Sequence, residues 1–236
     1  MKIGIMQPYF LPYIGYWQLI QCVDKYVIYD DVNFIKGGWI NRNRYLYQGE
    51  AKIFNIIMKE ASSFKKINEV ELMPSKEKYN PMEKLLSTFT MAYKKAPFYQ
   101  EVYAVLEEIV YFETNNLSCF IENSIREICK YLQIETELIL SSKIEKNNDL
   151  KKEARVIEIC KHLGGDTYIN AIGGKELYES KDFEKEGLKL NFLKTGDIVY
   201  KQFNNEFVPN LSIVDVMMFN SKEEIKKMLS DYSLEV

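Results

Sequence analysis

The sequence contains a single histidine, His162, among its 236 residues. A zinc site built from several histidines is therefore excluded, and a Ser-His-Asp triad would have to use His162. The chain also lacks the G-x-S-x-G pattern that carries the nucleophile of many hydrolases. If the protein is an enzyme, these absences favour Asp, Glu, Tyr or Lys as the groups that transfer protons.

Long apolar runs and closely spaced cysteines are also missing. No segment approaches the roughly 20 apolar residues of a membrane-spanning helix, and residues 1–8 lack the apolar core of a secretion signal. We therefore expect a cytoplasmic protein with no membrane span. The four cysteines show no C-x-x-C spacing, which favours reduced, buried thiols. The net charge of −3 argues against duplex nucleic acid as a partner, because that partner needs a basic surface.

What the chain does have is an alternation of apolar strands and helices. Residues 2–6 predict a strand, 16–23 a helix and 26–30 a second strand, which is the order of a parallel βαβ unit. The alternation returns in the second half, with strands at 137–141, 166–170 and 188–193 and helices at 149–163 and 222–230. We predict an α/β fold with a Rossmann-like, mostly parallel sheet flanked by helices.

The middle of the chain reads as helical. Apolar residues recur at intervals of three and four along 116–132, and 80–94 and 97–112 also suit helices. We therefore predict a single α/β domain over 1–236 with a helical insertion or subdomain at about 60–132. Residues 143–153 are the most polar stretch and predict a mobile loop or lid.

Ligands of open α/β sheets bind at the carboxyl ends of the strands, so the residues that follow strands are the candidates for a site. Gln7, Tyr9 and Tyr16 lie in a Pro-rich loop directly after the first predicted strand. Pro and Gly shape such a loop, and the helix that follows would direct its N-terminal amides at an anion. The loop predicts part of a phosphate or nucleotide pocket, although a rigid aromatic turn would look similar.

Two adjacent acids, Asp30 and Asp31, end the second predicted strand. Partial burial of both would raise one pKa, so that one acid acts as a general base or binds a hydroxyl group. A divalent cation held by the pair and a simple capping role are the alternatives. We take Asp30 and Asp31 as the candidate catalytic residues.

The stretch that follows is dense in groups that bind anions and stack on rings. Trp39 offers a flat face for a sugar or a base, Lys36, Arg42 and Arg44 suit phosphate, and Asn41 lies between them. These five residues are candidate substrate-binding groups.

Two later blocks add weaker candidates. Gly173 and Gly174 follow the 166–170 strand, with Tyr178 just beyond, and form a flexible backbone patch. Gln202 precedes Ser212 and Asp215, which resemble a helix capping box with Asp in the place of Glu.

Taken in order, these blocks resemble the WbqC-like family. The resemblance rests on Q-P-x-x-x-P-x-x-G-Y, V-I-Y-D-D-V-x-F, G-G-W-x-N-R-N-R, Y-x-x-x-x-G-G, Y-x-Q and P-x-L-S-x-x-D, spread over about residues 3–220. Members of this family are typically encoded in bacterial O-antigen and other surface-polysaccharide gene clusters. The resemblance therefore implies a role in lipopolysaccharide biosynthesis, in making or modifying an activated sugar.

Residues and resemblance together lead to one expected function and two alternatives. We expect a transferase that acts on a nucleotide-linked amino sugar and moves an acyl or aminoacyl group from a donor to the sugar amine. A glycosyltransferase or nucleotide-dependent ligase is the first alternative, and a non-catalytic binding protein of a polysaccharide assembly is the second. No cofactor or metal is indicated by the sequence, and a homodimer is possible.

Overall fold

A mixed sheet of six strands lies at the centre of the computed structural model, which describes residues 1–75, 80–204 and 206–236. The strand order is β10-β9-β8-β1-β2-β7, and all neighbours are parallel except β9 and β10. The bounds are β1 Lys2–Met6, β2 Lys25–Ile28, β7 Glu137–Leu140, β8 Thr167–Ala171, β9 Lys189–Thr195 and β10 Tyr232–Glu235. The predicted α/β fold with a mostly parallel sheet is confirmed.

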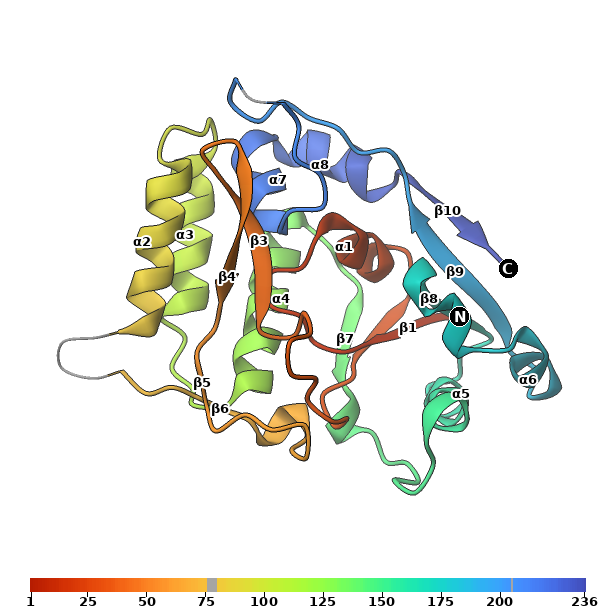
Figure 1. Ribbon diagram of the computed structural model, residues 1–236. Helices are drawn as coiled ribbons and strands as arrows, with labels where there is room; N and C mark the ends of the chain where they lie inside the picture. The colour runs from red at the N-terminus through yellow and green to blue at the C-terminus, as the bar shows by residue number, and fades with distance from the viewer. Residues whose placement is uncertain (76–79, 205) are drawn as a thin grey trace.

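The chain winds outward from β1 in both directions. It runs first through β2 and β7, then returns to the other side of β1 for β8, β9 and β10 (Figure 1). The order therefore reverses between β1 and β8, which is the switch point where doubly wound sheets bind ligands, at the carboxyl ends of the strands.

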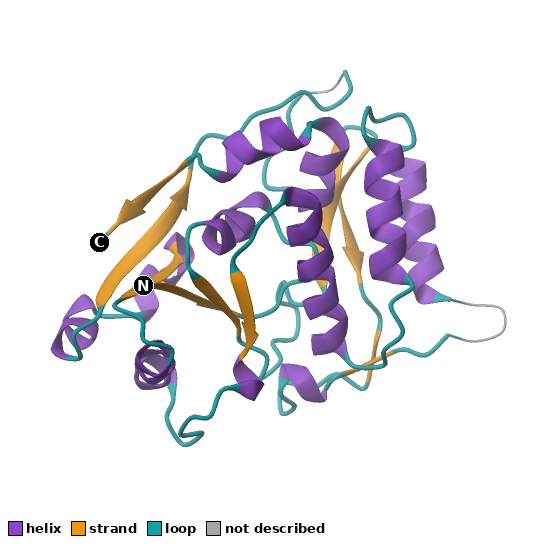
Figure 2. Cartoon of the chain, turned by 180° about the vertical axis from the view of Figure 1, so that it is seen from behind, coloured by secondary structure: helices purple, strands orange, loops and turns teal. Residues whose placement is uncertain are grey.

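Both faces of the sheet are covered, and side chains alternate between two apolar clusters. Tyr26 and Ile28 of β2 face one cluster, whereas Val27 faces the other, as the two-residue period of a strand requires. Helices α1 (Ile14–Gln21) and α8 (Lys222–Leu229) contribute to the first cluster, and α5 (Lys152–His162) and α6 (Ser180–Lys185) contribute to the second. Figure 2 shows these helices on the two sides of the sheet.

A long segment is inserted between β2 and β7, which are neighbours in the sheet. It begins with the hairpin of β3 and β4. Three helices follow; α4 starts at an Asn116 cap and buries the Leu117–Ile121–Ile125 stripe. The bounds are β3 Arg42–Tyr47, β4 Glu50–Asn55, β5 Met58–Lys59, β6 Glu71–Leu72, α2 Pro81–Tyr93, α3 Tyr99–Val110 and α4 Leu117–Leu132.

The remaining elements are short. Three 3₁₀ turns lie at Ile67–Glu69, Ser141–Lys143 and Ile172–Leu177, and α7 spans Ile213–Phe219. No helix in the described part of the chain is long and apolar enough to cross a membrane.

Candidate functional site

A cleft of about 310 Å³ lies between the loop that follows β1 and the first residues of β3. We call it the Trp39 cleft; it is lined by Tyr9, Pro12, Tyr13, Trp39, Asn43, Arg44 and Asn210. Three of these residues, Tyr9, Trp39 and Arg44, are among the candidates that the sequence predicted. The cleft therefore joins the first and third sequence motifs at one place.

Trp39 is held by a turn and by the arginines that follow it. The backbone N–H of Gly38 donates to the Ile35 carbonyl over 3.2 Å, and Gly37 takes a φ of +73°, which glycine adopts without strain. The Arg42 Nε donates to the Gly38 carbonyl over 2.9 Å, so much of the Arg42 guanidinium is used in bracing this turn.

Arg44 is the cation that faces the cleft. The guanidinium carbons of Arg42 and Arg44 lie 5.5 and 5.8 Å from the centre of the Trp39 ring, within the range of a cation–π contact. Arg44 Nη2 donates to the Asn210 carbonyl over 3.0 Å, whereas its buried Nε has no partner in the described structure. None of the described residues that line the cleft carries a carboxylate. An anion is therefore the ligand that this cleft can best accept.

Buried polar contacts hold the loop after β1 in place. The Tyr16 hydroxyl donates to the Gln7 carbonyl over 3.0 Å, and Trp17 Nε1 donates to the Pro12 carbonyl over 3.1 Å. A Cβ at Gly15 would lie 2.5 Å from the Tyr13 ring, so only glycine allows this ring to fold back over the start of α1. Tyr16 is buried in the core, where it positions the Gln7 carbonyl and its ring is closed off from a ligand.

Asp30 and Asp31 follow β2 as predicted, and both are buried. Both oxygens of Asp30 and the Oδ2 of Asp31 have partners, whereas Asp31 Oδ1 has none among the described residues. Asp30 accepts hydrogen bonds from the Ser142 backbone N–H over 2.9 Å and from the Ser142 hydroxyl over 2.6 Å. These contacts join the carboxyl end of β2 to the residues that follow β7. A base that must receive a proton from a substrate needs a free oxygen, so this environment suits a positioning role for Asp30.

Asp31 is the centre of a buried ion cluster. Its Oδ2 lies 2.9 Å from Lys146 Nζ and 2.6 Å from Arg155 Nη2. Burial raises the pKa of the Asp31 carboxyl, but the two cations and the Ser141 hydroxyl outweigh burial and hold that pKa below its ordinary value. The expected rise in pKa is therefore corrected for Asp31. Lys146 belongs to the predicted lid, yet its side chain is only 2% exposed and ties the segment down.

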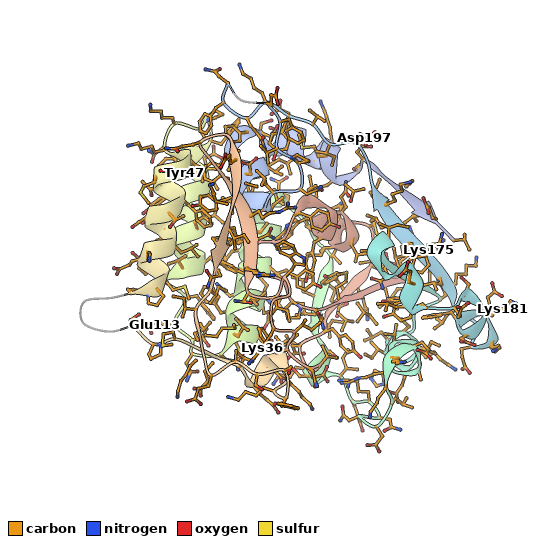
Figure 3. The ribbon with its side chains drawn as sticks, in the orientation of Figure 1. Lys36, Tyr47, Glu113, Lys175, Lys181 and Asp197 are labelled. Carbon is orange, nitrogen blue, oxygen red and sulfur yellow. The ribbon has the colours of Figure 1, made fainter. Side chains whose placement is uncertain are left out.

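The Gly173–Gly174 block lies elsewhere. Both glycines sit in the 3₁₀ turn after β8, and a Cβ at Gly174 would lie 2.5 Å from Asn170 Nδ2. Figure 3 shows Lys175, next to Gly174, well apart from Lys36. The Tyr178 ring packs edge-on against Tyr168. None of these residues lines the Trp39 cleft.

Gln202 is likewise a structural residue. It is buried, and its Nε2 donates to Asp215 Oδ2 over 2.6 Å while its Oε1 accepts from the Val208 backbone N–H over 2.7 Å. Asp215 also accepts from the Tyr93 and Tyr200 hydroxyls at 2.9 and 2.6 Å. Ser212 caps α7 as predicted, but the Asp215 carboxylate points to this buried network and not back to the cap.

The other candidates divide between exposed and structural positions. Lys36 is exposed on the turn before Trp39, and Asn41 Nδ2 donates to the Ile56 carbonyl over 3.1 Å. Tyr13, Asn43 and Asn210 line the cleft without having been predicted. Tyr13 and Asn43 lie inside the two recognised motifs and were within reach of the sequence, whereas nothing local marks Asn210.

A second cleft of about 390 Å³ shares Asn210 with the first. Its wall comes from Thr195 at the end of β9, from the segment that continues to Tyr200, and from the loop before α7. Asp197 is its one carboxylate among the described lining residues. Among all described residues, no group of three His, Cys, Asp or Glu side chains is arranged to hold a metal ion.

Comparison with known proteins gives a family but no reaction. The chain is 28% identical over 225 residues to the uncharacterized protein Rv1507c of Mycobacterium tuberculosis, and the match covers 93% of each chain. No solved structure matches the chain. The model of the WbqC-like protein family matches residues 7–227, which include every lining residue of the Trp39 cleft. The chain therefore belongs to the WbqC-like protein family.

Proposed function

We propose that this protein is an enzyme that binds a nucleotide-linked amino sugar in the Trp39 cleft and transfers an acyl or aminoacyl group to the sugar amine. The observation that carries the proposal is the buried, unpartnered Nε of Arg44 beside Trp39, which is 43% exposed. A buried donor without a partner is costly, and an anion that binds there removes the cost. The family resemblance to surface-polysaccharide proteins supports a sugar nucleotide as that anion.

The parts of such a ligand match the parts of the cleft. A phosphate oxygen would accept from Arg44 Nε, while Trp39 and Tyr9 would pack on the sugar or the base. The cleft volume of about 310 Å³ lies at the lower end of the range for small-molecule sites. The adjoining cleft, which shares Asn210, would then hold the donor or the rest of the ligand.

The transfer step needs few groups. The sugar amine attacks the carbonyl carbon of the donor and a C–N bond forms. The bond from that carbon to the leaving group breaks, and the leaving group takes up the proton that the amine releases. In this proposal Asp30 joins the end of β2 to Ser142 after β7, and Asp31 joins it to Lys146 and to Arg155 of α5. If Asp30 only positions other groups, Asp30→Asn should leave the pH profile of the reaction unchanged. If Asp30 were the essential base, the same variant would alter that profile and lower turnover at least 100-fold.

Binding is tested with the protein's own fluorescence. The chain has two tryptophans; Trp39 is 43% exposed and Trp17 is fully buried. We expect nucleotide-linked sugars to quench Trp39 emission in wild type, and Arg44→Gln to weaken binding about tenfold or more. Arg44→Lys keeps the charge but not the Nε geometry, and the matched control is Arg126→Gln, a half-exposed position on α4 that does not line the cleft.

Turnover is tested by mass spectrometry on a panel of nucleotide-linked amino sugars with acyl-CoA or aminoacyl donors. A product heavier by one acyl or aminoacyl group supports the proposal. If turnover requires ATP or a divalent metal, the protein is instead a ligase or a glycosyltransferase. If no sugar nucleotide changes Trp39 emission, and Arg44→Gln behaves like Arg126→Gln, the cleft is not the site and the proposal fails.

A further inference from the structure

Two turns that are distant in sequence lie side by side at the surface. Asn33 and Lys66 form an antiparallel bridge, and the Phe34 N–H donates to the Lys65 carbonyl over 2.9 Å. The paired backbone ends there, because the Lys65 N–H donates to the Ser62 carbonyl, and Ile35 and Phe64 are the next residues along the two segments. Each of the two neighbouring turns thus carries an apolar residue within two positions of the bridge.

Both tips are built by hydrogen bonds. The first turn closes from Gly38 N–H to the Ile35 carbonyl over 3.2 Å. The second closes from Lys65 N–H to the Ser62 carbonyl over 3.1 Å, and the Ser62 hydroxyl accepts from Phe64 N–H. These turns present Ile35 and Phe64 outward as parts of ordered backbone. We refer to residues 35–38 and 62–66 together as the twin-turn surface.

The apolar exposure of the twin-turn surface is large. Phe64 is 94% exposed, the highest value for any large apolar side chain that the structure describes, and Ile35 is 51% exposed. Trp39, immediately after the first turn, is 43% exposed. Single exposed apolar side chains are ordinary, but two on neighbouring turns, with Trp39 close in sequence, mark a candidate surface for a partner.

The charge around these side chains has one sign. The twin-turn surface carries Lys36, Lys65 and Lys66 and no acid, although the whole chain has a net charge of −3. None of the three lysines forms a salt bridge with another described residue. The flanking Glu69 carboxylate accepts a hydrogen bond from the Lys66 backbone N–H, and Glu60 lies on the other flank. Figure 3 shows Lys36 just below the lower end of β3.

We propose that the twin-turn surface docks on an anionic lipid bilayer. Phe64 and Ile35 enter the headgroup region, and the three lysines bind lipid phosphates, which is the combination that holds interfacial segments to membranes. No described pocket is lined by either apolar tip. A stable protein interface buries a broad surface, and the two turns comprise only nine residues. Lipid is therefore the occupant that the size and charge of this surface favour.

Vesicle sedimentation of the full chain tests this docking. We expect binding to phosphatidylcholine vesicles that contain phosphatidylglycerol, little binding to phosphatidylcholine alone, and weaker binding at high salt. Phe64→Ser should lower the partition coefficient roughly tenfold, and Lys65→Gln and Lys66→Gln about fivefold each. Because Phe64 is 94% exposed, its replacement leaves the fold intact.

Matched controls lie on α2 and just after it. Met91 is 63% exposed, and Lys95 is exposed beyond the end of the helix. Met91→Ser and Lys95→Gln should bind vesicles like wild type. Lipids with brominated chains should quench the exposed Trp39 and spare the buried Trp17.

Two outcomes would overturn the proposal. The first is that the wild-type chain does not bind anionic vesicles, or that Met91→Ser weakens this binding as much as Phe64→Ser does. The other is a dimer that Phe64→Ser converts to a monomer without any vesicle binding, which would assign the surface to a second copy of the chain. Neither outcome bears on ligand binding in the Trp39 cleft.

Discussion

Replacing Asp31 by Asn removes the carboxylate that two buried cations share. Asp31 Oδ2 lies 2.9 Å from Lys146 Nζ and 2.6 Å from Arg155 Nη2, and the side chains of these cations are 2% and 10% exposed. The asparagine keeps the shape of the side chain but carries no charge. Lys146 and Arg155 then remain buried side by side and repel each other.

The cost follows from burial. Removal of one partner from a buried ion pair costs roughly 3–5 kcal/mol, whereas an exposed pair is worth about 0–1 kcal/mol. Lys146 Nζ also donates to the Ser141 and Ile144 carbonyls, and these bonds survive. We therefore expect a loss near the lower limit, about 3 kcal/mol, which lowers the Tm of a chain of this length by roughly 6–12 °C.

Urea denaturation at several pH values measures this loss and its origin. Because the folded pKa of Asp31 is lowered, its contribution to stability is fully present above the unfolded pKa, whose ordinary value is 3.8. The contribution disappears as the pH falls through the folded pKa. The difference between wild type and Asp31→Asn should therefore be large at neutral pH and shrink in acid.

The matched control is Glu122→Gln, which breaks the more exposed pair with Arg126 on α4, whose side chains are 18% and 49% exposed, and should cost less than about 1 kcal/mol. A loss at Asp31 no greater than at Glu122 would refute the burial argument. A loss of the same size at neutral and acid pH would show that charge is not its source.

Three further predictions concern the cleft and the Asp215 network. Gly15→Ala places a Cβ 2.5 Å from the Tyr13 ring, so we expect Trp39-detected ligand binding to weaken at least tenfold, with a stability loss of about 1–3 kcal/mol. Tyr93→Phe takes one hydroxyl donor from Asp215 and should lower the free energy of unfolding in urea by about 1–3 kcal/mol. Burial raises the pKa of Asp215 although three donors oppose it, so the folded chain binds the extra proton. Stability should therefore fall as the pH rises from the unfolded pKa to the folded pKa of Asp215, and Asp215→Asn should remove this slope.

The sequence predicted the sheet well because its strands are local and apolar. Parallel strands buried on both faces read as continuous hydrophobic runs, and β1, β7, β8 and β9 all lie within two residues of their predicted ends. The helices of the insertion carry period-four stripes and cap residues, such as Asn116 before α4, and these features were equally visible.

The elements that were missed lack such signals. Helix α7 reads I-V-D-V-M-M-F and is buried on nearly every side, so its sequence shows no amphipathic period and resembles a buried strand. Helix α6 is only six residues long and buries a single side chain, Phe183. Strand β10 is an edge strand whose main support is its antiparallel pairing with β9.

The candidate site shows a different limit, because chemistry depends on partners that local sequence does not contain. Tyr9, Trp39 and Arg44 were found since each belongs to a short motif, whereas Asn210 contacts Arg44 across 166 residues. Asp30 and Asp31 show the same limit, because their partners are also distant in sequence. Two aspartates after a strand look alike whether they are free or paired, and Ser142 and Arg155, which engage Asp30 and Asp31, lie 112 and 124 residues away. A carboxylate at a strand end is therefore evidence of where a site lies, and only its partners decide whether it can act as a base.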